Sequence, residues 1–269
     1  MSEELVAPVD AAQVERRLAD REIAWPPPRV LASTGSTNAD ALALAHEGAP
    51  EGTVVVADEQ TAGRGRLGRE WVSAPGAGLW CSTLIRMPAS AGRGLLPLLA
   101  GVAVAEAVRR HGVEASLKWP NDVVIDGPAL DGTPGPRKLA GILAESDGED
   151  VVVIGIGVNV RQSADQLPVP AATSLLLEGS GVSRDELLVD ILTGLHTGIE
   201  SLRREGAGFA LDAYRALCLT IGRDVVVSLP SGEVVTGRAV GVGDDGQLHV
   251  RTAEKTMSVA AGDVIHATI

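Results

Sequence analysis

The segment from Thr53 to Trp71 reads TVVVADEQTAGRGRLGREW, an apolar run followed by a glycine-rich loop with three arginines. The run TVVVA over 53–57 is typical of a buried strand. Because the loop satisfies GxGxxG, the first interpretation to test is a Rossmann dinucleotide site, in which a helix opens directly after the glycines. The residues that follow are REWVSAPGAG, whose proline and glycines disfavour a helix. The segment therefore argues against a Rossmann fold.

The arginines of this loop indicate an anion-binding site. Glycines let the backbone wrap around a ligand, and guanidinium groups bind carboxylates and phosphates through two hydrogen bonds. A solvent-exposed basic loop is the alternative. The chain as a whole carries a formal net charge of -12, which disfavours nonspecific binding of nucleic acids. We therefore expect a small, local anion at the loop and no nucleic-acid partner.

The composition is that of an ordinary globular protein, with 45% hydrophobic and 22% charged residues over 269 positions. The longest nearly uncharged apolar stretch, 95–105, is shorter than the roughly 18 residues of a membrane span. The N-terminus MSEELVAPVD lacks the layout of a signal peptide, so we predict a cytoplasmic protein without a membrane partner. Cys81 and Cys218 have no CxxC context, the histidines lack ligand spacing, and GxSxG is absent, which disfavours zinc enzymes and serine hydrolases.

Hydrophobic periodicity divides the chain into two parts. The first is predicted to alternate helices and strands, and the second, from Arg223 onward, to consist of short strands separated by SG, DDG and AGD turns. We therefore predict an α/β catalytic domain with a mixed sheet over 1–221 and an SH3-like β-barrel over 222–269. Helices are expected at 10–22, 95–111 and 209–219. Two further helices are expected to begin at capping boxes, one at 37–40 and one at 183–186, and the second of these should extend to 204. The further strands are expected at 29–32, 79–86, 122–125, 138–145 and 151–160.

Two further segments carry polar groups next to predicted strands. In LKWPND, over 117–122, a proline fixes the chain before a strand and displays a lysine, an amide and a carboxylate. In RKLAGI, over 137–142, Lys138 begins an otherwise apolar strand. Turn formation explains the first pattern and protection of an edge strand the second. A ligand site built from both segments is the functional alternative.

Taken together, these segments resemble the biotin protein ligases. The matching motifs are STN at 36–38, DEQTAGRGRLGREW at 58–71, KWPNDV at 118–123, KLAGILAE at 138–145 and GIGVN at 155–159. The pair GRGRxGR and KWPND is specific, whereas each motif alone is weak. With the C-terminal barrel, the resemblance extends over nearly the whole chain. It implies a catalytic domain similar to that of class II aminoacyl-tRNA synthetases.

The resemblance also implies an activity. Such enzymes join biotin to MgATP to form biotinyl-5′-AMP and transfer biotin to a lysine of a biotin carboxyl carrier domain of acyl-CoA carboxylases. The residues expected to contact biotin are Ser36, Thr37, Asn38, Gln60, Gly63, Arg64, Lys138, Gly141 and Gly157. Those expected to contact ATP or the adenylate are Arg64, Gly65, Arg66, Arg69, Trp71, Lys118, Asn121 and Asn159, with Trp71 stacked on adenine. The catalytic residues implied are Lys138, Arg64, Asp122 and Arg69, where Asp122 either holds Mg²⁺ or orients the target lysine.

Three expectations concern partners and rivals. Only about 35 residues precede STN, so we expect no DNA-binding domain and no repressor function. A monomer or a weak homodimer is expected. The rival functions are a lipoate or octanoate ligase or transferase, which shares the catalytic fold, and a non-catalytic biotin sensor, which the presence of Lys138 disfavours.

Overall fold

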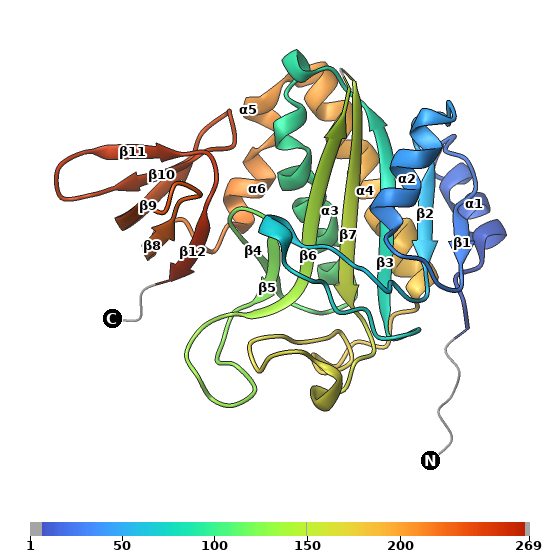
Figure 1. Ribbon diagram of the computed structural model, residues 1–269, viewed down its shortest axis with the longest axis horizontal. Helices are drawn as coiled ribbons and strands as arrows, with labels where there is room; N and C mark the ends of the chain where they lie inside the picture. Colours follow the sequence, from blue (N-terminus) through green and yellow to red (C-terminus); the bar gives the residue numbers. More distant parts are fainter. Residues whose placement is uncertain (1–6, 149, 267–269) are drawn as a thin grey trace.

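The computed structural model describes residues 7–148 and 150–266 and contains two β-sheets (Figure 1). The larger sheet has seven strands in the order β1-β2-β3-β7-β6-β5-β4, and the smaller has five in the order β11-β10-β9-β8-β12. Only β1 and β2 pair in parallel among these strands. The prediction of a mixed-sheet α/β fold is confirmed, and where an SH3-like β-barrel was predicted the structure has a five-stranded antiparallel sheet.

The helices and strands have the following bounds. The larger sheet contains β1 (Arg29–Leu31), β2 (Val54–Ala57), β3 (Gly78–Arg86), β4 (Ala115–Lys118), β5 (Asp122–Ile125), β6 (Arg137–Asp147) and β7 (Val151–Asn159). The smaller sheet contains β8 (Asp224–Ser228), β9 (Val234–Val242), β10 (Leu248–Arg251), β11 (Thr256–Val259) and β12 (Asp263–His266). The α-helices are α1 (Ala11–Ala19), α2 (Thr37–His46), α3 (Leu96–Arg110), α4 (Arg184–Glu205), α5 (Ala207–Ala210) and α6 (Asp212–Leu217).

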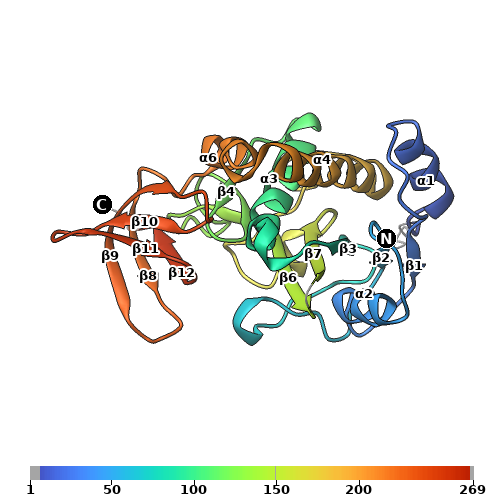
Figure 2. The same cartoon turned by 90° about the horizontal axis from the view of Figure 1, so that it is seen from above.

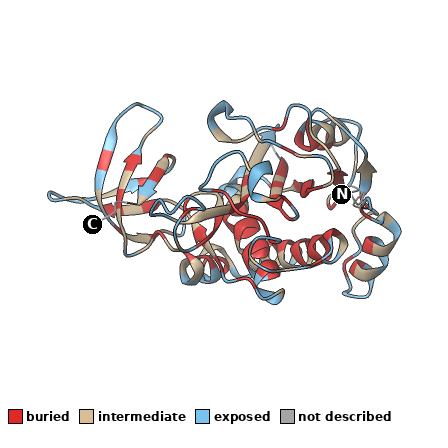
Figure 3. Ribbon diagram, turned by 90° about the horizontal axis from the view of Figure 1, so that it is seen from below, coloured by how far each residue is buried: buried red, intermediate tan, exposed pale blue. Residues whose placement is uncertain are grey.

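Helices cover both faces of the larger sheet. Helices α3 and α4 lie on one face and α2 on the other (Figure 2). The alternation along β2 shows why its sequence is uniformly apolar: Val54 and Val56 join the cluster that includes α3 and α4, whereas Val55 joins the cluster of α2. Figure 3 shows buried residues concentrated on the long helices and the central strands. The strand prediction at 53–57 is confirmed.

The face of β7 that carries α2 is only partly covered by that helix. Val151 and Val153 pack in the α2 cluster. Because side chains alternate along a strand, the next residues on the same face are Gly155 and Gly157. This face therefore changes from apolar side chains to bare backbone beyond the N-terminus of α2, and the candidate site lies there.

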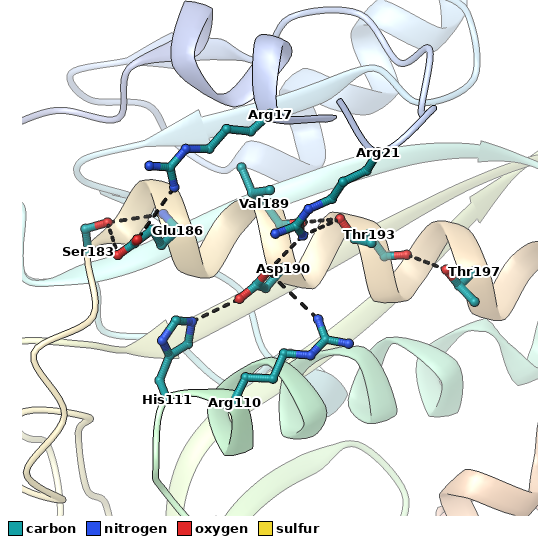
Figure 4. A network of polar contacts seen from close by, with 10 residues as sticks. All are labelled: Arg17, Arg21, Arg110, His111, Ser183, Glu186, Val189, Asp190, Thr193 and Thr197. Carbon is teal, nitrogen blue, oxygen red and sulfur yellow. Dashed lines mark hydrogen bonds and ion pairs between the residues drawn. The ribbon is translucent and has the colours of Figure 1, made fainter. Parts of the chain in front are cut away.

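On the other face of the sheet, a network of polar contacts connects helices α1, α3 and α4 (Figure 4). The carboxylate of Asp190, on α4, lies 2.8 Å from a guanidinium nitrogen of Arg21, which follows α1. It also lies 3.0 Å from Nε2 of His111 and 3.8 Å from Arg110, both at the end of α3. One nearly buried carboxylate thus joins α1, α3 and α4.

The structure differs from the sequence-based expectations in three elements. Strand β4 was not predicted, although its burial alternates as expected of a strand at the edge of a sheet. The segment 209–219 forms two short helices that meet at Leu211 instead of one. The predicted capping box at 37–40 is wrong because Ser36 is the N-cap of α2 and makes no side-chain capping bond. At α4 the predicted N-cap is confirmed, since Ser183 accepts from the backbone N–H of Glu186. The Glu186 carboxylate accepts from the Ser183 hydroxyl, so only the N-cap half of the predicted capping box is present in the described structure.

Within the described residues, no helix combines the length and apolar character needed to cross a membrane.

Candidate functional site

The floor of the site consists of glycines on adjacent strands. Gly141 of β6 pairs with Gly157 of β7. A Cβ atom added at Gly157 would lie 2.7 Å from the indole of Trp71, and one at Gly141 would lie 2.9 Å from the same ring. Glycine at these positions therefore permits close approach, and the group that approaches in this structure is Trp71.

Asn38 covers the third glycine of this face. A Cβ at Gly155 would lie 2.3 Å from Oδ1 of Asn38, so any side chain there would displace the asparagine. The amide nitrogen of Asn38 donates to the backbone oxygen of Leu143 at 3.2 Å and to Oε2 of Glu145 at 2.7 Å. Its Oδ1 lies 2.6 Å from the hydroxyl of Ser82. Asn38 is therefore fixed on all sides by the protein.

A neutral hydrogen-bond network forms the wall beside this floor. Oε1 of Gln60 accepts from the backbone N–H and from the hydroxyl of Thr37, at 2.9 and 3.0 Å. The amide nitrogen of Gln60 donates to Ser73 at 3.2 Å, and the hydroxyl of Ser82 lies 2.7 Å from that of Thr37. Gln60 thus occupies the place that the capping-box prediction gave to Asp40, whose carboxylate instead accepts from Thr34. Ser36, Thr37 and Asn38 are all buried.

The glycine-rich loop is a compact turn with both ends pinned. The backbone N–H of Trp71 donates to the oxygen of Gly63, and that of Gly65 donates to Arg69. Leu67, at the tip, has a φ of 57°, a left-handed conformation uncommon for leucine. A Cβ at Gly63 would lie 2.5 Å from the backbone oxygen of Trp71. Gly63 therefore serves to let the loop ends pack together.

Each of three cations at the mouth of the site is paired with a carboxylate. Arg64 lies 3.0 Å from Glu145, Lys138 lies 2.6 Å from Asp122, and Arg69 pairs with Asp263. Arg66 donates instead to the neutral Oδ1 of Asn121, at 3.2 Å. The Nζ atom of Lys138 also lies 5.3 Å from the centroid of the Trp71 ring, a cation–π contact.

Burial affects two of the neighbouring cations. Desolvation lowers the pKa of Lys118, and the carboxylate of Asp122 opposes this shift. Desolvation likewise lowers the pKa of Arg66, with Asp263 and Asp122 acting in the opposite direction. Cations are thus concentrated here at some electrostatic cost, which an anionic ligand would relieve.

These parts enclose one cavity of about 720 Å³. Apart from Gly63, every residue predicted for the site lines it: Ser36, Thr37, Asn38, Gln60, Arg64, Gly65, Arg66, Arg69, Trp71, Lys118, Asn121, Asp122, Lys138, Gly141, Gly157 and Asn159. The cavity therefore joins a buried neutral wall to a half-exposed cationic mouth. A ligand with an uncharged ring at one end and an anion at the other would match this arrangement.

Two of the predicted polar residues are engaged by the protein itself. The amide nitrogen of Asn159 donates to the backbone of Thr173 at 2.9 Å, and its oxygen accepts from Gln162 at 3.2 Å. The amide nitrogen of Asn121 donates to the backbone of Ile142 at 2.9 Å. Both side chains therefore hold backbone segments at the rim of the cavity.

Besides the loop residues Pro168, Val169 and Ala172, sequence reasoning missed two groups of residues. One is the wall from the smaller sheet, formed by Ser228, Asp263, Val264 and Ile265. The other is Glu145, which was quoted within KLAGILAE without a role. The period-two alternation from Gly141 through Leu143 could have placed Glu145 on the site face. No sequence spacing indicated that Asp263 would line the cavity, because its position next to Arg69 depends on how the two sheets pack.

Trp119 anchors the smaller sheet beside the cavity. Its ring is buried, and its indole N–H donates to the backbone oxygen of Gly246 at 3.0 Å. The KWPND segment thus joins the two parts of the chain.

Comparisons with known proteins agree with this arrangement. A family model described as "Biotin/lipoate A/B protein ligase family" matches residues 30–160, and one described as "Biotin protein ligase C terminal domain" matches residues 220–267. The biotin–[acetyl-CoA-carboxylase] ligase of Mycobacterium tuberculosis is 40% identical over 268 residues, covering 96% of each chain. The enzyme of that name from Paracoccus denitrificans is 33% identical and covers 87% of this chain and 98% of its own. The structure of a biotin protein ligase from Aquifex aeolicus in complex with biotin and ATP superposes with a TM-score of 0.76 at 28% identity, covering 89% of this chain and 99% of that one.

Proposed function

The chain belongs to the biotin protein ligase family and is a biotin ligase, and from this premise we propose that it forms biotinyl-5′-AMP and transfers biotin to a lysine of a biotin carboxyl carrier domain. The observation that carries this proposal is the cavity in which the neutral wall of Thr37 and Gln60 meets the cations Arg64 and Lys138.

The chemistry of the first step requires positive charge. An oxygen of the biotin carboxylate attacks the α-phosphorus of ATP, the bond to the β-phosphate oxygen breaks, and pyrophosphate leaves. Both reactants are anions, so fixed cations that cancel their repulsion lower the activation barrier. Holding the two reactants in the correct orientation lowers the barrier further. In the second step the amine of the target lysine attacks the acyl carbon, and AMP leaves.

We assign the cations to these anions by their position along the cavity. Arg64 and Lys138 serve the biotin carboxylate and the α-phosphate, and Arg66, Arg69 and Lys118 serve the remaining phosphates. Asn38, Thr37 and Gln60 shape the pocket for the uncharged ring system, and Trp71 moves from the glycine floor to the adenine. The ion pairs of Arg64, Lys138 and Arg69 support this assignment, because an anionic ligand can replace a carboxylate in such a pair, and Arg66 and Lys118 line the same cavity.

The residues at the mouth fit a nucleotide-bound magnesium ion. Mg²⁺ in such sites binds through phosphate oxygens, water and one or two carboxylates. Asp122 is the carboxylate we propose for it, since it lines the cavity beside Lys118 and Lys138. When bound, the ion would neutralise phosphate charge. Orientation of the target lysine is the alternative role of Asp122.

We extend the proposal to the organisation and setting of the chain. The matches at 30–160 and 220–267 support a division at residue 221 into a catalytic domain and a C-terminal domain. The two free, buried cysteines support a cytoplasmic setting, and the net charge of -12 supports the absence of a repressor function. The proposed oligomeric state is a monomer or a weak homodimer.

A transfer assay tests the proposed function. The purified protein is incubated with labelled biotin, MgATP and the isolated carrier domain of an acyl-CoA carboxylase. We expect label on the carrier only when ATP is present, together with release of pyrophosphate. Pyrophosphate release with lipoate or octanoate, and none with biotin, would instead identify a lipoate-type ligase.

A further inference from the structure

Glu145 occupies a position at the site that the proposed function leaves unused. It lies on β6, and its Oε2 atom accepts from Arg64 at 3.0 Å and from the amide of Asn38 at 2.7 Å. One carboxylate oxygen thus contacts both the charged mouth and the neutral wall. The Glu145 side chain is 26% exposed and that of Arg64 48% exposed.

Arg64 lines two cavities that share part of their walls. One is the site cavity, and the other has a volume of about 660 Å³. Glu145 lines this second cavity, together with Leu67, Pro97 and Gln247. The ion pair therefore joins Arg64 to a carboxylate that lines the second cavity and is not among the residues lining the site cavity.

The contacts of Asn38 prevent Glu145 from following Arg64 into the site. Asn38 is held against Gly155 and Ser82, and its amide holds the Glu145 carboxylate. An anion that draws Arg64 into the site cavity would therefore separate it from Glu145. Because a partly exposed ion pair contributes little stability, this exchange is energetically cheap.

We propose that Glu145 is a positioning residue that serves as the counter-ion of Arg64 in the empty enzyme, and that the carboxylate of biotin takes its place on binding. This inference rests on the proposed function. It predicts that the enzyme distinguishes the acid from uncharged analogues partly through this exchange. An analogue without a carboxylate leaves Arg64 on Glu145.

Calorimetric binding of two ligands to Glu145→Gln tests the proposal. Glutamine keeps an acceptor for Asn38 and removes the charge that competes for Arg64. We expect the Kd for biotin to fall about 2- to 5-fold, the range that an exposed ion pair supports. We expect the Kd for the alcohol analogue, in which CH₂OH replaces the carboxylate, to stay unchanged. In an Arg64→Ala background, Glu145→Gln should no longer affect biotin binding.

Asp147→Asn is the matched control. Asp147 lies two residues further along β6 and pairs with the exposed His46, so the variant removes the same charge from the same strand. We expect both ligands to bind it as they bind the wild type.

Three results would overturn the inference: weaker biotin binding in Glu145→Gln, an unchanged Kd for biotin, or an equal shift for both ligands. The last would mean that Glu145 only shapes the pocket. If Glu145→Gln does not fold, Glu145→Asp, which withdraws the charge by one methylene, should shift the biotin Kd in the same direction by a smaller factor, and an unchanged or higher Kd would overturn the inference. A wild-type protein that binds no biotin at all would remove the proposed function, and this inference with it.

Discussion

The two ends of the cavity solve different electrostatic problems. At the neutral wall, Thr37, Asn38 and Ser82 are buried and joined by hydrogen bonds between uncharged groups. At the mouth, the side chains of Arg64 and Arg69 are 48% and 65% exposed and pair with carboxylates. Neutral dipoles can be buried once they are paired, whereas removing a charge from water costs several kcal/mol. We therefore expect the buried wall to bind the uncharged part of a ligand by its shape and the exposed mouth to bind the charged part.

The strongest test of this comparison is Lys138→Ala, which removes a cation of the mouth. We expect adenylate formation, measured as biotin-dependent exchange of pyrophosphate into ATP, to fall at least about 10²-fold, as when a preorganised electrostatic group is lost elsewhere. Lys255→Ala removes an exposed lysine in the turn between β10 and β11 and serves as the control. Exchange within about threefold of the wild type would show that Lys138 is not a cation of the reaction.

Gly155→Ala tests the neutral wall. The new methyl group would displace Asn38 and break its bonds to Ser82 and Leu143. We expect the free energy of unfolding in urea to fall by about 1–3 kcal/mol, with weaker biotin binding. Gly241→Ala, in strand β9 where nothing lies near the added Cβ, is the control. Equal stability of the two variants would mean that the wall is not rigid.

Protonation of His266, near the charged mouth, is expected to change the free energy of unfolding with pH. Burial, with smaller contributions from Lys118 and Arg223, lowers its pKa from 6.5 to about 4. The unfolded state therefore binds the proton first, so stability is full above about pH 6.5 and is lost as the pH falls toward 4. We expect this histidine to contribute about 1–2 kcal/mol to that loss, allowing for solvent near the ring.

The measurement is urea unfolding at pH 7 and pH 4.5 for the wild type and for His266→Gln. The variant should lose less stability between the two pH values. Identical losses in the wild type and His266→Gln would show that His266 titrates normally.

Raising the ionic strength should produce the smallest of these effects. It should weaken ligand binding at the charged mouth and leave binding at the neutral wall unchanged. Exposed charges interact over about 10 Å at 0.1 M salt and over about 3 Å at 1 M. We expect the KM for ATP to rise several-fold between these concentrations. Binding of the uncharged alcohol analogue of biotin should change little. A similar change for both ligands would mean that charge is not confined to the mouth.

Sequence patterns predicted the elements whose signals are local. The buried strand at 53–57, the helix at 95–111 and the strands at 122–125 and 138–145 follow from periodicity and turn residues. The cluster of motifs predicted most of the cavity lining. The predicted capping box at the start of α2 was wrong because Gln60, from a distant segment, accepts from the backbone N–H and the hydroxyl of Thr37, which a local capping box would use.

The partners of the cations could not be predicted, because they are distant in sequence. Glu145 lies 81 residues from Arg64, and Asp263 lies 194 residues from Arg69. Such contacts depend on the order of strands and on the packing of the two sheets. Lys118 was predicted for the site, but its four-residue strand, β4, was not, because it is recognisable only once β5 is paired with it.

Trp71 gives the cavity an intrinsic optical reporter. Its ring lies edge-on to that of Trp80, with centroids 6.1 Å apart, while its indole nitrogen is enclosed without a hydrogen-bond partner in the described structure. Two indoles this close exchange excitation energy, and the spectrum of each depends on the polarity around it. A ligand that lifts Trp71 from the glycine floor would separate the two chromophores, so the emission of the unlabelled protein should follow occupancy of the cavity in real time.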